Sequence, residues 1–252
     1  MSKTKQMTTI TAGRFVRVVA YSRSMPYDST QARQAKARFS SQARQATNFR
    51  TAWENAQMLL LTNFDPAVVG SVHMVLTYDD AHVPKNRRSA KRYAQGFFDR
   101  LRSTCRMQGE PCLYLYNTEE HTSGGDGCRI HHHVVLWCGK LTRDYDLLRS
   151  LWLAGSNVEI RPLGMDKRYS EDMRELAKYL CKERSPDIKD GAVGDKVCVG
   201  SRTLRRPVKH SELVEETLTL MEPPGTVRVE RSSASNSFGT FDRLDYLTPA
   251  KK

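Results

Sequence analysis

The spacing of apolar residues between positions 73 and 184 switches several times between two periods, and this order limits the fold more than any other feature. Alternating and β-rich runs predict strands at 73–78, 112–118, 129–138 and 158–160. Helical spacing and capping residues predict helices at 88–106, 147–152 and 170–184. The order strand-helix-strand-strand-helix-strand is the split βαβ arrangement. We therefore expect an α+β fold whose antiparallel sheet carries helices on one face.

The segments on either side of this region differ from it in composition. Residues 1–65 are basic and polar, and good helix formers at 30–61 predict one long or broken helix there, so we expect a largely helical N-terminal extension. The central domain is expected at 66–212. Ser, Pro and Gly become frequent towards the C-terminus, where few residues could build a core. This composition predicts a loosely ordered tail at 213–252.

The charge balance is strongly basic. The chain has 40 Lys and Arg residues against 28 Asp and Glu, a formal net charge of +12. Such an excess favours a polyanionic partner, and nucleic acid is the commonest one. A one-sided basic stretch can equally be a solvated face, so both interpretations of the N-terminal arm stay open. The side chains expected to contact DNA are Arg33, Lys36, Arg38, Arg44, Arg129, Arg202, Arg205 and Arg206.

The cysteines and the apolar runs bear on the cellular compartment. The six cysteines form no CxxC pair, which gives no support to a zinc ribbon or a thioredoxin-like site. No signal-peptide pattern opens the sequence, and no run of 18 apolar residues could span a bilayer. We expect a cytoplasmic protein with free thiols and no membrane association.

Residues 129–136 contain a His-His-His triplet in a predicted strand. Side chains alternate between the faces of a strand, so His131 and His133 point the same way and can share one divalent metal. His132 falls on the opposite, apolar face. There a packed or hydrogen-bonded histidine is more ordinary than a ligand. A bare HxH pattern is weak support for a metal site.

An acidic pair ends the preceding strand. A carboxylate from Glu119 or Glu120 would complete a site of two imidazoles and one acid, although the ordinary interpretation of this pair is a solvated turn. Mixed nitrogen and oxygen ligands suit Mn²⁺ or Mg²⁺ better than the all-sulfur sites that zinc often uses.

The last predicted helix carries a tyrosine at the edge of its apolar stripe. Tyr179 is ordinarily an amphipathic residue that closes the rim of a core. It could instead be a nucleophile, with Lys182 lowering the phenol pKa from its usual value of ~10 or binding a phosphate. Glu183 could activate water for release, and a surface salt bridge is its more ordinary role.

These motifs resemble those of the HUH endonuclease superfamily, in particular the rolling-circle replication initiators of bacterial plasmids and phages. Residues 75–78 are similar to the first, structural motif. The histidine triplet resembles the metal-binding motif, and residues 179–182 resemble the YxxK nucleophile motif. The resemblance points to Glu119 as the third ligand. It implies a single nucleophilic tyrosine, because Tyr169 is ten residues from Tyr179 rather than one helical turn.

The resemblance implies metal-dependent nicking and joining of single-stranded or hairpin origin DNA through a 5′-phosphotyrosine, which starts and ends rolling-circle replication. The sequence has no GxxxxGK[ST] loop, so a separate host helicase is expected, and self-association is left open. A conjugative relaxase or an insertion-sequence transposase would use the same chemistry. A non-catalytic RNA-binding module is the alternative from another class, and it predicts exposed aromatic residues such as Tyr114 and Tyr116.

Overall fold

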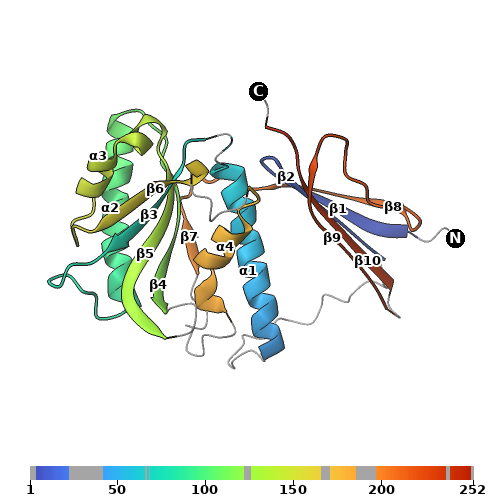
Figure 1. The fold of residues 1–252 in the computed structure, drawn as a ribbon, viewed down its shortest axis with the longest axis horizontal. Helices are drawn as coiled ribbons and strands as arrows, with labels where there is room; N and C mark the ends of the chain where they lie inside the picture. The colour runs from blue at the N-terminus through green and yellow to red at the C-terminus, as the bar shows by residue number, and fades with distance from the viewer. Residues whose placement is uncertain are drawn as a thin grey trace. The chain divides into compact units, whose positions relative to one another are not determined.

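The chain divides into two compact units in the computed structural model, which describes residues 4–22, 42–65, 67, 69–121, 126–165, 171–185, 197–236 and 239–250. The central unit is Ser40–Arg205, and the terminal unit combines Met1–Phe39 with Arg206–Lys252. Each unit is built on its own sheet (Figure 1). The central unit therefore starts earlier than the expected domain limit at 66.

The sheet of the central unit has the strand order β6-β3-β5-β4-β7, and every neighbouring pair is antiparallel. The strands are β3 (Val72–Thr77), β4 (Leu113–His121), β5 (Gly127–Trp137), β6 (Val158–Pro162) and β7 (Cys198–Gly200). The first four follow the split βαβ order, which confirms the predicted α+β class. The short strand β7 extends the sheet beyond β4.

Four α-helices accompany this sheet in the described part of the central unit. They are α1 (Gln42–Asn63), α2 (Arg87–Met107), α3 (Tyr145–Ser150) and α4 (Arg174–Leu180). The predicted helix at 88–106 matches α2, whose start is fixed by a capping box between Asn86 and Ser89. The core lies between α2, α3 and one face of the sheet, where Phe97 and Phe98 pack with residues such as Leu76 and Val134.

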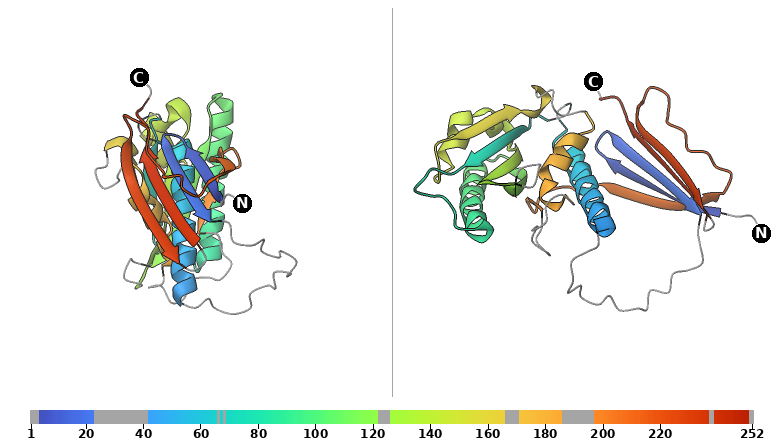
Figure 2. Two further views of the ribbon diagram at one scale, coloured as in Figure 1. Left: turned by 90° about the vertical axis from the view of Figure 1, so that its right-hand side faces the viewer. Right: turned by 60° about the horizontal axis from the view of Figure 1, so that its bottom comes forward.

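Helices lie over the other face as well, which differs from our expectation. Figure 1 and Figure 2 show α4 and α1 across the sheet from α2 and α3. Helix α1 packs against α4, and the Gln57 amide donates to the backbone oxygen of Asp172 at 2.8 Å. A single covered face was expected because the strand pattern marks one apolar face. The second face is partly polar, and it carries the site described below.

The last predicted helix is shorter than expected. The described helix α4 starts at Arg174 and follows Met173, a non-glycine residue with a φ of 53°. Ser170, the expected cap, lies outside the described residues. Helix α4 ends at Leu180, and the 3-10 turn η3 (Lys182–Arg184) follows it. Residues 182 and 183 thus leave the direction that a continuous helix would give them.

The terminal unit corrects two expectations. Its sheet has the order β8-β1-β2-β10-β9, built from β1 (Thr4–Ala12), β2 (Phe15–Ser22), β8 (Val208–Glu215), β9 (Val227–Asn236) and β10 (Gly239–Leu247). The described N-terminal residues 4–22 are strands rather than a helical extension. The C-terminal segment, expected to be loosely ordered, forms an antiparallel hairpin of β9 and β10.

A buried ion pair explains part of this difference. Arg17 on β2 donates from Nε and Nη2 to the two carboxylate oxygens of Asp245 on β10, both at 2.9 Å. The two residues are 228 positions apart in the chain. An arginine that looks like part of a basic arm is therefore satisfied inside a sheet, which no local pattern can indicate.

Candidate active site

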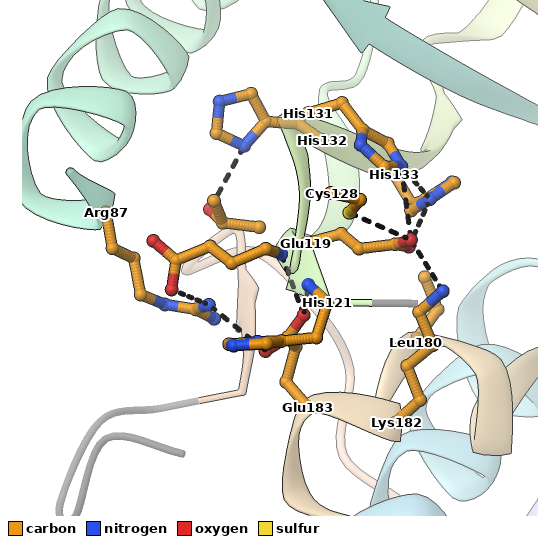
Figure 3. Close-up of polar contacts among 12 residues, drawn as sticks. Arg87, Glu119, His121, Cys128, His131, His132, His133, Leu180, Lys182 and Glu183 are labelled. Atoms are coloured by element: carbon orange, nitrogen blue, oxygen red, sulfur yellow. Dashed lines mark hydrogen bonds and ion pairs between the residues drawn. The ribbon is translucent and has the colours of Figure 1, made fainter. Parts of the chain in front are cut away.

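Three expected ligands meet on one face of the central sheet. Strands β4 and β5 place Glu119 opposite His131, and strand alternation puts His133 on the same face. His133 Nε2 is 2.8 Å from Glu119 Oε2 and 3.1 Å from His131 Nε2. One potential ligand atom from each residue lies within 4.8 Å of the others. This group could hold a metal ion (Figure 3).

The electrostatics of the three side chains suit a cation. Burial alone would raise the pKa of Glu119, but hydrogen bonds from His131, His133 and Lys182 outweigh it and lower the pKa. Burial lowers the pKa of His133 and favours its neutral imidazole. The pKa of His131 is raised, because its hydrogen bond to Glu119 outweighs burial. A charged carboxylate and a neutral imidazole are the forms that bind metals.

A fourth histidine, absent from our sequence prediction, supports the site. His73 on β3 is 4% exposed, and its Nε2 lies 3.2 Å from Nδ1 of His133. With the proton of this hydrogen bond on His133 Nδ1, its Nε2 is free for a ligand role. The alternation at 72–77 places His73 opposite the core residue Met74. The sequence contained this signal, but not the strand order that brings His73 next to His133.

The tyrosine of α4 reaches the same point. The Tyr179 hydroxyl is 3.0 Å from Nε2 of His133. Lys182 is buried, with its ammonium 4.4 Å from the centre of the Tyr179 ring and 2.6 Å from Glu119 Oε1. We expected Lys182 near the tyrosine, and its ion pair with the acid was not foreseen. The lysine therefore joins the tyrosine to the ligand group.

Glu183 has neither of the roles we expected. It is 6% exposed, so it forms no surface salt bridge, and its oxygens are occupied. One oxygen accepts from the backbone N–H groups of Glu120 at 2.8 Å and His121 at 2.9 Å, and the other lies 2.9 Å from His121 Nδ1 (Figure 3). These contacts hold the end of β4, where the register shifts after Glu119. Glu120 itself turns towards Arg87, 3.3 Å away.

A family model matches the part of the chain that carries this site. Residues 71–185 match a family described as Replication-associated protein, of the ORF2 type, and this segment is a little under half of the chain. This segment belongs to that family. Searches of curated proteins and of solved structures found no match. The replication-associated segment runs from the start of β3 to the end of η3, so it includes the ligand group, Tyr179 and Lys182.

The other face of the replication-associated segment holds the remaining histidine of the triplet. His132 is fully buried, with its Nε2 2.6 Å from the Tyr78 hydroxyl and its Nδ1 3.0 Å from the Thr118 hydroxyl. Burial lowers the pKa of His132 to about 3, so the ring is neutral. As expected, it is a hydrogen-bonded core residue.

A cavity of about 680 Å³ opens over the ligand group of the replication-associated segment. Its wall includes His131, His133, Tyr179 and Lys182. The sequence did not indicate the other lining residues, which come from α1, β3, β6 and α4 and include Phe49, Val75, Glu159, Arg161 and Lys178. The cavity brings both an aromatic side chain and charged groups to the nucleophile.

The side chains expected to contact DNA lie elsewhere. Arg33, Lys36 and Arg38 are outside the described residues, and so is the side chain of Arg44. Arg202, Arg205 and Arg206 are exposed, and Arg129 contacts Asp80 and the Tyr78 carbonyl at 2.9 and 2.8 Å. None of the described ones lines the cavity. Their contact with DNA stays a prediction.

Two further expectations concern the whole chain. The RNA-binding alternative needed exposed Tyr114 and Tyr116, but both are 6% exposed, and Tyr114 stacks on Phe98 with ring centres 3.9 Å apart. That prediction is wrong, because α2 covers these rings. All six cysteines are free. Within the described part of the chain, no helix has the length and apolar character needed to span a membrane.

Proposed function

We propose that this replication-associated protein nicks and rejoins single-stranded origin DNA with Tyr179 as the nucleophile, and so starts and ends rolling-circle replication. One observation carries the proposal. The Tyr179 hydroxyl lies 3.0 Å from an imidazole nitrogen of His133 that belongs to a group able to hold a metal. A tyrosine that only closed the rim of a core would not need this position. The family match supports a role in replication.

The proposed reaction is a transesterification. The Tyr179 oxygen forms a bond to the scissile phosphorus while the bond to the 3′ oxygen breaks. The phenol releases its proton to water, and the departing oxygen takes one up, leaving a free 3′-hydroxyl and a 5′-phosphate linked to tyrosine. The number of phosphoester bonds is unchanged, so attack by a 3′-hydroxyl reverses the step and joins the ends.

The surrounding residues have separate tasks in this proposal. A divalent ion held by Glu119, His131 and His133, for which we propose Mn²⁺ or Mg²⁺, would offset charge on the phosphate oxygens. Lys182 places a positive charge beside the Tyr179 ring, where the phenolate develops.

The DNA substrate is proposed to be single-stranded or an extruded hairpin. A separate helicase would then open the template. A relaxase or a transposase would use the same chemistry on another DNA target, and the match to a replication-associated family favours the initiator.

The nucleophile can be identified by trapping the covalent intermediate. The protein is incubated with Mn²⁺ and a pool of randomised single-stranded oligonucleotides labelled at the 3′ end, because the 3′ fragment stays on the tyrosine. We expect a labelled protein band that disappears in Tyr179→Phe, with the nucleotide mapped to the peptide containing residue 179. Tyr93→Phe on the outer face of α2 is the matched control. An adduct that persists in Tyr179→Phe, or one mapped to Tyr169, would overturn the mechanism.

A further inference from the structure

The outer face of α2 carries a row of arginines that the proposed reaction does not use. Arg88, Arg92, Arg102 and Arg106 are all exposed, and their spacing of four, ten and four residues keeps them on one side of the helix. We call this row the α2 arginine stripe. The opposite side of α2 buries residues such as Phe97 and Leu101 in the core. The stripe is therefore held on a rigid element.

The charge of the stripe is largely uncompensated. Asp99 is the sole acid among the residues of α2, and it pairs with Arg102. Among the described residues, no ion pair joins Arg88, Arg92 or Arg106 to a carboxylate. A solvated helix face usually mixes charges of both signs, because pairs of opposite charge three or four residues apart stabilise a helix.

The stripe also opposes the helix that carries it. The first turn of α2 contains Arg87 and Arg88 and no acidic residue, although the positive end of the helix dipole favours acids there. Arg88 and Arg92 are like charges at i and i+4, and so are Arg102 and Arg106, which destabilises a helix. Helix stability does not explain this arrangement, whereas binding of a polyanion would.

The position of α2 relates the stripe to the active site. The helix covers the face of the sheet opposite to the cavity (Figure 1). Its first residue nevertheless reaches the edge of the site, where Arg87 lies 3.3 Å from Glu120, the neighbour of Glu119 (Figure 3). From Arg88 to Arg106 the stripe extends for roughly 27 Å, at about 1.5 Å per residue. It thus leads away from the point where a cleaved strand would leave the site.

We propose that the α2 arginine stripe binds the phosphate backbone of duplex DNA beside the single-stranded segment in the cavity. A straight, rigid row of guanidinium groups matches the regular phosphates of a duplex, which lie about 3.4 Å apart along each strand. Single strands are instead held in grooves lined with aromatic side chains, and here Phe49 and Tyr179 line the cavity on the other face. The location of the single strand rests on the proposed function, whereas duplex binding by the stripe does not require nicking.

The test compares two double variants of the full chain that lose equal charge. Arg88→Gln with Arg92→Gln shortens the stripe, and Lys140→Gln with Arg143→Gln removes two exposed charges from the turn η1 (Gly139–Arg143). The probe is a labelled duplex of arbitrary sequence, titrated at several salt concentrations. Losing two phosphate contacts should lower the slope of log K against log salt by about 1.8 and weaken binding on the order of tenfold at about 0.15 M salt. The control pair should leave the slope unchanged.

Two further measurements separate the outcomes. The stripe variant should keep the affinity of the parent for a single strand of the same sequence, and it should keep the yield of the covalent adduct. Equal duplex slopes in the stripe and control variants would overturn the proposal, and so would an equal loss of single-strand binding. If the parent forms no adduct but the duplex slopes still differ, the stripe assignment stands and the nicking proposal falls.

Discussion

Replacing Glu183 with alanine should destabilise the central unit and loosen the metal-ligand group together. The side chain is 5% exposed, and one oxygen accepts two backbone hydrogen bonds from Glu120 and His121 at 2.8 and 2.9 Å. A hydrogen bond to a charged group contributes about 1.5–3 kcal/mol. The two donors are only partly buried, so water can reach them in the variant and the lower figure applies to each. We expect a loss of about 3 kcal/mol in the free energy of unfolding.

The measurement is urea unfolding followed by circular dichroism, with two matched variants. Glu183→Gln keeps an oxygen for the backbone donors and loses the charge, so it should lose about half as much stability as Glu183→Ala. Glu175→Ala removes an exposed acid that pairs with Lys178 on α4, and its change should stay within about 0.5 kcal/mol.

Metal affinity provides the second readout. Glu183 holds the backbone of the residue that follows Glu119, so its loss should displace that carboxylate. Outer-shell partners of metal ligands affect affinity by roughly 10–100-fold, and we expect a weakening of that order in a calorimetric Mn²⁺ titration of Glu183→Ala. A stability equal to that of Glu175→Ala would refute the buried hydrogen bonds. A large loss of stability with unchanged Mn²⁺ affinity would show that Glu183 supports the fold but does not position Glu119.

Two further predictions test the ligand assignment and the terminal unit. Glu119→Gln should weaken Mn²⁺ binding far more than Glu120→Gln, because Glu120 contacts Arg87 instead, and the reverse order in a calorimetric titration would move the third ligand by one residue. Burial would raise the pKa of Asp245, but hydrogen bonds from Arg17 and Arg243 outweigh it and lower the pKa. Its stabilising effect is therefore present above the unfolded pKa of about 3.9 and is lost as pH falls through the lower folded value. Asp245→Asn should destabilise the protein at pH of about 7 by roughly 3–5 kcal/mol and flatten the dependence of the urea midpoint on pH below about 4, whereas an unchanged acid dependence would contradict this.

The central unit was predictable where a feature depends on local periodicity. Helix α2 and the common face of His131 and His133 follow from the spacing of side chains along single elements. The role of His73 did not follow, because it needs the strand order that places β3 beside β5. Strand order is a long-range property, and one sequence contains no direct record of it.

The terminal unit was not predictable for the same reason in a stronger form. Strand β1 pairs with β8, which lies about 200 residues further along the chain, as in the contact between Thr8 and Ser211. A polar N-terminal strand and a serine-rich C-terminal hairpin each look like disordered arms when taken alone. The apolar residues that they bury, such as Ala20 and Leu244, form one cluster only after the two ends meet.

The end of α4 decides how the nucleophile and the ligand group are held together. A helix continuing to residue 184 would have kept Lys182 and Glu183 on the helix surface. Because α4 stops at Leu180, the turn η3 directs these two neighbours onto the end of β4, where Lys182 contacts the Glu119 carboxylate and Glu183 holds the backbone that follows it. Any shift of α4 that moved Tyr179 would disturb both contacts at once. The position of the phenol and that of the carboxylate are thus coupled, so variants of η3 should change metal affinity and adduct formation together rather than separately.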